Sequence, residues 1–512
     1  MRTKLVLPAL TEAKSPFFRP VKYSLFPPLG LATLAAFLDP SDEVSLQDEH
    51  VEDLDLDDDP ELVGIEVYVT SARRAYALAD RYRARGAHVV LGGLHVTSCP
   101  EEAARHADTI VLGPAEEAWP RFLADFRAGR PRPVYRSESR TLAGLPRVRR
   151  DLIRRDLYLV PNSLVVSRGC PHACAFCYKD GFFSGGRSFY VQPVEEALAE
   201  IERLPGRHLY FLDDHLFGHP AFAETLFDGM RGMGRLWQAA STVDAVLRPG
   251  LLEKAVACGL RSLFVGFETL GAESLRTQGK RQNLGRDYGE AVRRLHDLGV
   301  MVNASFVFGF DEDDASVFER TVEWAIRQGV ETATFHVLTP YPGTELFRRM
   351  EADGRLLHRD WDLYDTRHAV FRPERMAPRQ LEEGYWRAYR DFYRWGGILR
   401  GAATKPDVVG RLRHAAYAIG WKKCEPVWDI LIRARRVARA LPLLERVLAG
   451  TAPAHVRVDV LRKARRASRV RVRGRGGEAR LTSVACRSKV PQFPKEEVPC
   501  RSSTDPPYSS VS

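Results

Sequence analysis

The chain has 512 residues, of which 45% are hydrophobic and 28% are charged, so it has material for several buried cores and is neither fibrous nor disordered throughout. Its 76 Lys and Arg against 66 Asp and Glu give a net charge of +10, but residues 455–512 alone carry +9, which leaves +1 on residues 1–454. The basic balance therefore does not indicate a nucleic-acid or membrane partner for the main body.

No segment has the length of a membrane span. The longest uniformly apolar stretch, residues 29–38, is about half of the roughly 20 residues that a transmembrane helix needs. The first residues lack the pattern of a secretory signal, so we expect a cytoplasmic protein without a transmembrane segment. Eight cysteines are too few for a disulfide scaffold, and in a reducing compartment clustered cysteines more often bind metal or do chemistry.

Residues 1–130 alternate β-branched runs with helical patterns and predict a Rossmann-like, doubly wound α/β domain that binds ligands where its strands end. The expected strands are 4–8, 44–48, 62–69, 88–92 and 109–113. The expected helices are 29–38, 72–85, 101–106 and 117–126. The Pro- and Arg-rich residues 131–157 lack an apolar period and are predicted to be a linker.

The alternation resumes over residues 158–345 and predicts six strand–helix units in a partial (β/α)6 barrel, with functional residues at the strand ends. The expected strands are 164–167, 208–212, 238–243, 262–267, 301–308 and 332–338, with helices at 194–204, 221–230, 251–258, 288–298 and 315–328. Residues 346–454 are predicted to be helical, with aromatics at helix spacing that pack on the barrel. Residues 455–512, Arg-rich and then Ser- and Pro-rich, predict a basic disordered tail.

Three cysteines, Cys170, Cys174 and Cys177, follow the first barrel strand in a C-x3-C-x2-C spacing. Thiolates this close together can bind one iron–sulfur cluster, and three ligands leave one iron of a four-iron cluster open to an amine and a carboxylate. The alternatives are zinc with His172 as a fourth ligand, or three unrelated thiols. His172 lies between its supposed partners, where the loop would be cramped, so the cluster is favoured.

This motif, with Phe176 before its last cysteine, resembles that of the radical S-adenosylmethionine (SAM) superfamily. The resemblance implies a [4Fe–4S] cluster on the three cysteines and SAM bound to the open iron. It also implies that an electron from a donor such as flavodoxin or ferredoxin cleaves SAM to a 5′-deoxyadenosyl radical. The strand ends 212–215, 265–269 and 306–310 are similar to elements that hold SAM in this superfamily.

The cysteine motif and these elements imply further SAM contacts, namely Phe176, Asp213, Asp214, Glu268 and Gly309. Carboxylates suit such a site because the methionine ammonium and the ribose hydroxyls need acceptors. The alternative for each acid is a helix cap or an ion pair with a nearby Arg.

In the first domain, Thr70-Ser71 follows the third strand and Gly92-Gly93-Leu94-His95-Val96-Thr97 the fourth. Glycines let a backbone approach a ligand, and hydroxyls hold polar groups. Together with segments 27–30, 48–50 and 113–116, they resemble the cobalamin-binding domain of the B12-dependent radical SAM family. With the barrel and the aromatic helical segment included, the resemblance to this family covers about residues 1–400 of this chain. The implied cobalamin contacts are Thr70, Ser71, Gly92, Gly93, His95, Thr97, Gly113 and Glu116.

One departure from that family concerns the lower ligand of cobalt. Members that use histidine carry Asp-x-His-x-x-Gly after the first strand, but residues 8–11 here contain no histidine, and Asp53 stands where the glycine would follow Asp48-Glu49-His50. We therefore predict that no histidine of this motif binds cobalt. His95 could approach the corrin, although packing is the alternative.

The leading hypothesis is a cobalamin-dependent radical SAM enzyme that methylates an unactivated carbon of a small-molecule or lipid substrate. A second hypothesis is a cyclase or rearrangement enzyme with the same cofactors. Methylthiolation of transfer RNA would need more cysteines in the first domain, which has only Cys99. A non-catalytic cobalamin- or nucleic-acid-binding protein is the last alternative, with nucleic-acid contact expected only through the tail.

Overall fold

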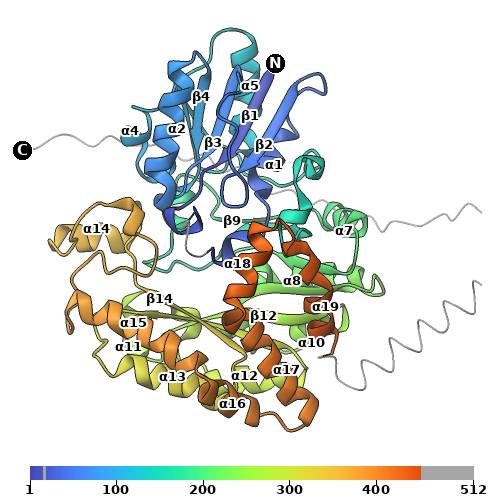
Figure 1. The fold of residues 1–512 in the computed structure, drawn as a ribbon, viewed down its shortest axis with the longest axis vertical. Coiled ribbons are helices and arrows are strands. Elements are labelled where there is room, and N and C mark those ends of the chain that lie inside the picture. Colours follow the sequence, from blue (N-terminus) through green and yellow to red (C-terminus); the bar gives the residue numbers. More distant parts are fainter. Residues whose placement is uncertain (15–18, 451–512) are drawn as a thin grey trace, which may run out of the picture. The chain divides into compact units, whose positions relative to one another are not determined.

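The computed structural model describes residues 1–14 and 19–450, so the predicted disordered tail lies outside the described residues. Figure 1 shows the first domain in blue above the green and yellow barrel. Both belong to one compact unit. Within the described residues, no helix is long and apolar enough to cross a membrane.

The first domain is built on a parallel six-stranded sheet of order β2-β1-β3-β4-β5-β6. Its strands are β1 (Arg2–Leu7), β2 (Glu43–Asp48), β3 (Leu62–Glu66), β4 (His88–Gly92), β5 (Thr109–Leu112) and β6 (Val134–Arg136). Alternate residues of the central strands pack on α1 (Leu29–Ala35) and α5 (Ala115–Arg127) on one face and on α2 (Ala72–Ala84) on the other. The predicted doubly wound domain is therefore confirmed.

The prediction was wrong for one strand and one helix of this domain. Strand β6 lies in the predicted linker and pairs with β5 at the edge of the sheet. Three residues after Pro131 and Pro133 are too few to show an apolar period, so only the pairing reveals this strand. The expected helix 101–106 is the shorter α4 (Pro100–Ala103), and it is preceded by an unpredicted short helix, α3 (Leu94–Ser98).

The second sheet is also parallel and has the order β14-β13-β12-β11-β10-β7, which confirms the partial barrel. Its strands are β7 (Ser163–Leu164), β10 (His208–Phe211), β11 (Leu236–Thr242), β12 (Leu260–Glu268), β13 (Met301–Phe308) and β14 (Thr332–Val337). The helices between them are α7 (Val194–Arg203), α8 (Pro220–Met230), α9 (Val243–Val246), α10 (Leu251–Ala257), α11 (Ala272–Thr277), α12 (Tyr288–Asp297) and α13 (Val317–Arg327).

The expected first barrel strand is divided in two. After β7 the chain enters a separate antiparallel pair, β8 (Ser167–Gly169) and β9 (Phe189–Val191). The cysteine loop and the short helix α6 (Lys179–Phe182) lie between these two strands. The loop is therefore held at both ends by β8 and β9.

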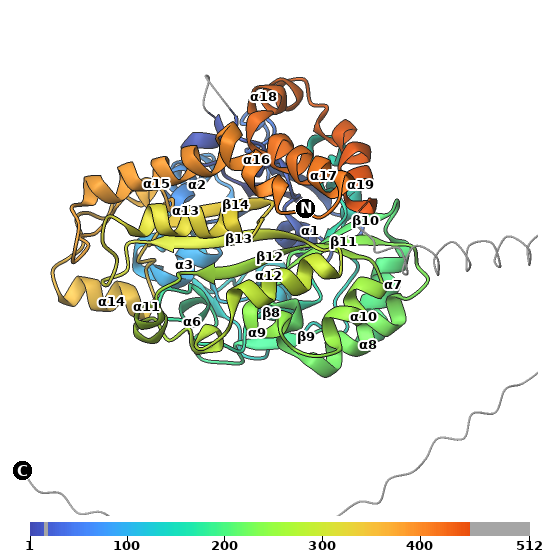
Figure 2. The same cartoon turned by 90° about the horizontal axis from the view of Figure 1, so that it is seen from below.

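The chain then forms helices, of which α15 covers the open edge of the barrel beside β14, as Figure 2 shows. They are α14 (Glu345–Ala352), α15 (Pro378–Tyr393), α16 (Trp395–Ala403), α17 (Val408–Ala418), a π-helical turn η9 (Ile419–Lys423), α18 (Glu425–Arg433) and α19 (Leu441–Ala449). The hydroxyls of Tyr389 and Tyr393 accept from the N–H groups of Phe335 (3.2 Å) and Ala333 (3.1 Å) in β14. The aromatic stripe of α15 thus packs on the barrel, as predicted. Its tyrosine hydroxyls also accept hydrogen bonds from backbone N–H groups of the edge strand β14.

Candidate functional site

A cavity of about 700 Å³ lies where the strands of both sheets end. The first domain contributes Leu7 and Glu66 from β1 and β3, and the barrel contributes Leu212 and Asp214 after β10. Residues between 142 and 150, in the predicted linker, line a third side. The carboxyl ends of parallel strands are the usual binding edge of α/β domains, so the fold directs two such edges at one space.

A second cavity, of about 110 Å³, lies inside the first domain between its sheet and α1 and α5. Its wall is largely apolar and includes Leu5, Trp119 and five glycines, which are Gly30, Gly64, Gly92, Gly93 and Gly113. A Cβ atom added to Gly64 would lie 2.8 Å from Cδ2 of Leu5 and 3.6 Å from the ring of Trp119. The missing side chains therefore keep open an apolar slot, which shares Gly30, Glu66 and Arg168 with the larger cavity.

The three motif cysteines lie close enough together to influence one another's ionisation. Burial, with a smaller contribution from neighbouring thiolates including that of Cys174, raises the pKa of Cys170 to about 11 and that of Cys177 to about 12. Such thiols stay protonated at neutral pH unless a metal displaces the proton. Gln282 donates a hydrogen bond to Sγ of Cys174 (3.6 Å).

His172, the fourth ligand in the zinc alternative, is not grouped with the three cysteines. Among the described residues, no three His, Cys, Asp or Glu side chains are grouped to hold one metal ion. The His172 ring lies against that of His215 instead, with centroids 5.6 Å apart. Ligands of a cluster bind different iron atoms and therefore lie further apart than the ligands of one ion.

A buried lysine that the sequence analysis missed lies beside the cysteines. Lys280 pairs with Glu268, and its Nζ is 6.0 Å from the ring centre of Phe176. Burial opposes its charge, but Glu268, Cys174 and Cys177 together raise the pKa of Lys280. Lys280 follows a separate short helix, so nothing in the motif spacing points to it.

Glu268 reaches Lys280 through an unusual backbone. Its φ of 65° lies in the left-handed region, which is rare for a residue with a side chain, and the pairing of β12 with β13 is irregular from Gly266 to Glu268. Strain of this kind often marks functional positions. Gly309 is also in a left-handed conformation (φ 103°), but it packs against Leu381 and Phe371 rather than lining either cavity.

The structure separates the two neighbouring acids, Asp213 and Asp214. Oδ1 of the buried Asp213 accepts hydrogen bonds from the N–H of Val166 (3.1 Å), from Oγ of Ser167 (2.6 Å) and from the N–H of Ser167. Asp214 accepts from the N–H of Gly169 (2.9 Å) and from the hydroxyl of Tyr178, and it lines the large cavity. Asp213 therefore anchors the chain that leads to the cysteines and lines neither cavity, and its contact with SAM stays a prediction.

Asp213 should make stability depend on pH. Burial raises its pKa to about 7, so between about pH 4 and pH 7 the folded chain holds a proton that the unfolded chain has released. The free energy of unfolding therefore falls as pH rises through this window, by at most roughly 1.4 kcal/mol per pH unit. We expect Asp213→Asn to flatten this fall in denaturant unfolding at about pH 5 to 8. Asp214→Asn is the control, and an unchanged slope in Asp213→Asn would contradict the assignment.

In the first domain, the predicted cobalamin contacts Gly92, Gly93 and Gly113 line the apolar slot. Glu116 borders it and binds Arg168 of β8 across a 2.6 Å ion pair. Thr97 lines neither cavity. Its Oγ1 connects two glycine loops, because it donates a hydrogen bond to the carbonyl of Gly93 and accepts one from the N–H of Gly113, both at 2.9 Å.

Three other predicted cobalamin contacts lie outside both cavities. His95 is fully buried, with Nε2 3.2 Å from Oε1 of Glu102 and its ring edge against Trp361. Ser71 is buried and bonds to the backbone of Tyr68, and Thr70 beside it lines neither cavity. No histidine is among the described residues that line either cavity. None of the three lines a cavity, so the contact of Thr70, Ser71 and His95 with cobalamin stays a prediction.

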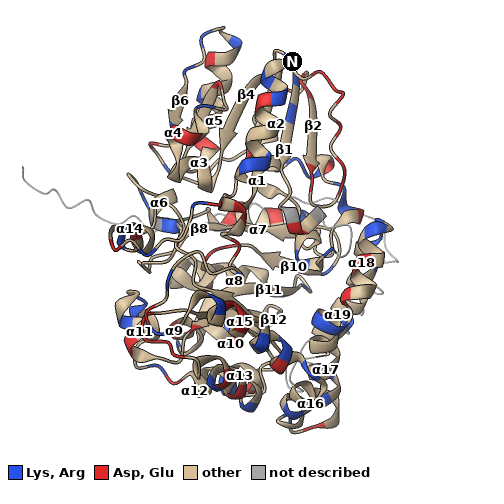
Figure 3. Ribbon diagram, turned by 60° about the vertical axis from the view of Figure 1, so that its left-hand side comes forward, with Lys and Arg blue, Asp and Glu red and all other residues tan. Residues whose placement is uncertain are grey.

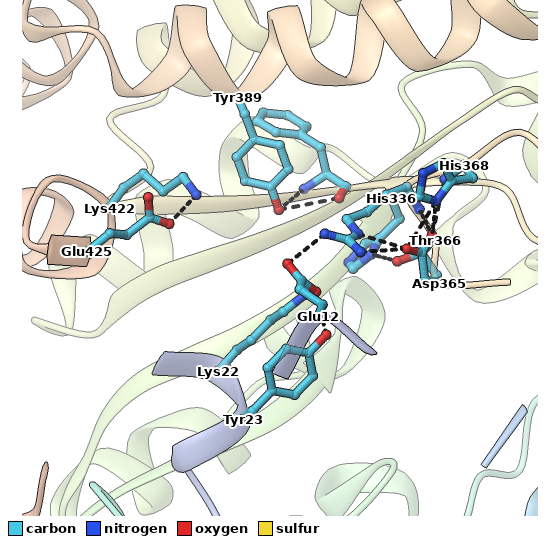
Figure 4. A network of polar contacts seen from close by, with 12 residues as sticks. Glu12, Lys22, Tyr23, His336, Asp365, Thr366, His368, Tyr389, Lys422 and Glu425 are labelled. Atoms are coloured by element: carbon cyan, nitrogen blue, oxygen red, sulfur yellow. Dashed lines mark hydrogen bonds and ion pairs between the residues drawn. The ribbon is translucent and has the colours of Figure 1, made fainter. Parts of the chain in front are cut away.

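Glu12, near the start of the chain, binds the segment that follows the barrel, as Figure 4 shows. Glu12 binds Arg367 (2.6 Å) and accepts from the hydroxyl of Tyr23 (2.5 Å). Nearby, Nδ1 of His336 on β14 lies 3.2 Å from Oγ1 of Thr366, and burial lowers the pKa of His336 to about 4. This polar network joins the segment before α1 to the last barrel strand.

Comparison with known families agrees with both sheets. Residues 21–123 match the model of the B12 binding domain, and residues 164–325 match that of the radical SAM superfamily. One relative is bacteriochlorophyllide d C-12(1)-methyltransferase of Chlorobaculum tepidum, 29% identical over 74% of this chain and 85% of its own length. Another is hopanoid C-2 methylase of Rhodopseudomonas palustris, 26% identical over 66% of each chain.

Two solved structures share the fold over most of the chain. The radical SAM methyltransferase TsrM of Kitasatospora setae, solved with tryptophan and a SAM analogue, has a TM-score of 0.59 at 15% identity and covers 85% of this chain and 99% of its own. The cobalamin-dependent SAM radical enzyme OxsB, solved with aqua-cobalamin and SAM, has a TM-score of 0.60 at 13% identity and covers 92% and 81%.

A doubly wound domain with a glycine-lined slot, placed before a partial barrel with a C-x3-C-x2-C loop, defines a radical SAM protein with a B12-binding domain. The chain belongs to the B12-binding radical SAM enzymes.

Proposed function

We propose that this enzyme methylates an unactivated carbon of a tetrapyrrole-like substrate that carries a carboxylate. The observation that carries the proposal is the 700 Å³ cavity, which both strand edges face and which borders the glycine-lined slot. Its size suits a large ligand, since pockets for small molecules span about 300–1,000 Å³.

The chain's own residues fit the two cofactors of this family. Cys170, Cys174 and Cys177 would bind three irons of a [4Fe–4S] cluster, and the cation of Lys280 would balance the thiolate charge. The slot between Gly64 and Trp119 would receive an apolar part of cobalamin. When bound, the cluster with SAM supplies a carbon-centred radical after one-electron reduction, by a donor such as flavodoxin or ferredoxin, and cobalamin supplies the methyl group.

The cavity wall favours an anionic substrate. Arg147 in the linker and Arg203 on α7 line the cavity, and neither forms an ion pair with a described residue. Both side chains are exposed to solvent, and guanidinium groups bind carboxylates well, whereas an uncharged polycyclic lipid would offer them no such contact. Two relatives from Chlorobaculum tepidum are named for methylation of bacteriochlorophyllide d. A carboxylate-bearing tetrapyrrole is therefore the preferred class over a hopanoid.

The test is product analysis with the anaerobically reconstituted full chain, SAM, cobalamin and a reductant. With bacteriochlorophyllide d as probe, we expect a methylated product together with S-adenosylhomocysteine and 5′-deoxyadenosine. Arg147→Gln with Arg203→Gln should raise KM for this probe more than it lowers kcat. 5′-Deoxyadenosine without S-adenosylhomocysteine would support cyclisation or rearrangement instead, and turnover of an uncharged hopanoid alone would overturn the substrate class.

A further inference from the structure

Large hydrophobic side chains are exposed mainly at the C-terminal end of the described chain. Of the 13 exposed ones among the described residues, eight lie within residues 395–450. Each of the eight has between 52% and 67% of its surface exposed. Single exposed hydrophobics are normal on a protein surface, but such a concentration marks an interaction site.

These eight residues follow helical spacing. Trp395 and Leu399 are four residues apart on α16, as are Val408 and Leu412 on α17, and Val427 and Ile430 are three apart on α18. Such pairs share one side of a helix, so each helix presents an apolar row to solvent. We call these rows, with Val409 of α17 and Leu443 of α19, the C-terminal surface.

The four helices are neighbours. Helix α17 packs on α16 and α19, and α18 contacts η9, which follows α17 directly. Nζ of Lys423 in η9 lies 5.6 Å from the ring centre of Trp395, which connects η9 to the apolar row of α16. Figure 3 shows α18, α19, α17 and α16 one below another along one edge, with blue basic segments among them.

Positive charge is concentrated on the same helices. Residues 394–450 contain 12 Lys and Arg but only four Asp and Glu, a net +8. Residues 1–393 contain 50 Lys and Arg against 57 Asp and Glu, a net −7. The near-neutral total of residues 1–454 therefore hides an acidic catalytic part and a basic helical end.

We propose that the C-terminal surface binds the anionic face of a lipid bilayer. Helices with an exposed aliphatic and tryptophan row and an excess of Lys and Arg bind at the membrane interface, where the row enters the headgroup boundary and the cations meet anionic lipid. The chain after residue 450 is basic as well, so it is not complementary in charge to this surface. Nucleic acid would match the charge but leave the aliphatic rows exposed to water.

The experiment is flotation of the full chain with vesicles of phosphatidylcholine, with or without about 30 mol% phosphatidylglycerol. We expect binding to the anionic vesicles that weakens in about 0.5 M NaCl. The triple variant Leu399→Glu, Leu412→Glu and Ile430→Glu should bind at least about tenfold more weakly, because its apolar rows carry charge. The matched control replaces three exposed hydrophobics elsewhere, Val134→Glu, Leu270→Glu and Leu357→Glu, and should bind as the unchanged chain does.

Unchanged basal SAM cleavage and thermal unfolding of the triple variant would show that its fold is intact. The proposal is overturned if the unchanged chain does not float with anionic vesicles, or if the triple variant floats equally well. It is also overturned if the unchanged chain is an oligomer in solution that the triple variant dissociates, because the surface would then be a contact between copies of this chain. Deletion of residues 451–512 should weaken flotation without abolishing it, and complete loss would assign the binding to the tail.

Discussion

Cys174→Ala is expected to abolish iron–sulfur absorption and SAM cleavage in the anaerobically reconstituted enzyme. Cys174 is buried, and its thiolate interacts with those of Cys170 and Cys177. A cluster that loses one of its three protein ligands keeps only two bonds to the chain, so its iron is no longer held. Iron content should fall from about four per chain to near zero, as measured by iron analysis and visible absorption.

The control is Cys258→Ala. Cys258 is also buried, but it follows α10 and donates a hydrogen bond to the carbonyl of Ala255, far in sequence from the motif. Its loss should leave iron content and the release of 5′-deoxyadenosine unchanged. Cys174→Ala protein that retained SAM cleavage would refute the cluster assignment, and stoichiometric zinc in the unchanged enzyme would revive the alternative that includes His172.

Gly64→Leu is expected to remove cobalamin from the enzyme. Gly64 lies inside β3 in the wall of the 110 Å³ slot, where a Cβ already comes within 2.8 Å of Leu5. Three further carbons would occupy much of a slot this small, so a cobalamin group that enters it would be excluded. Retention of cobalamin should fall below about a tenth, read from the visible absorption of the purified protein.

Gly64→Ala serves as a graded comparison, because one methyl group at 3.6 Å from Trp119 needs only a shift of the Leu5 side chain. We expect weaker cobalamin binding in Gly64→Ala than in the unchanged chain, but more than in Gly64→Leu. Iron content and SAM cleavage without substrate should persist in both variants, since the slot and the cysteine loop lie in different domains. Full retention of cobalamin by Gly64→Leu would show that the slot holds no part of it.

The two cofactor sites differ in how far sequence could predict them. The three motif cysteines could be recognised from their spacing, because one short loop supplies all three thiols. No spacing in the sequence points to Lys280 or Arg168. Lys280 pairs with Glu268, and Arg168 pairs with Glu116, only after separate elements have packed together. The slot glycines Gly92, Gly93 and Gly113 were predicted from their places after strands, but Gly64 was not, because it lies within one.

Asp213 and Asp214 show most clearly which parts of the site the sequence alone could not predict. Neighbouring residues at a strand end point in different directions, so Asp213 and Asp214 could not both face the cavity. Asp213 is the buried one because the chain breaks for two residues between β7 and β8. Val166 and Ser167 at this break donate hydrogen bonds to its carboxylate. His95 likewise follows the end of a strand, where ligands usually bind. Its ring instead contacts that of Trp361, which is far away in the sequence.

By itself, the sequence determined the two parallel α/β domains, their order, the cysteine motif and the missing histidine after the first strand. These features are local, since they depend on periodicity over a few residues and on spacing within one loop. Only the tertiary structure decided which side chains line the two cavities and that the apolar rows of α16 to α18 stay exposed. The physical reason is that burial and ion pairing depend on neighbours distant in sequence, and these are known only once the sheets and helices have packed.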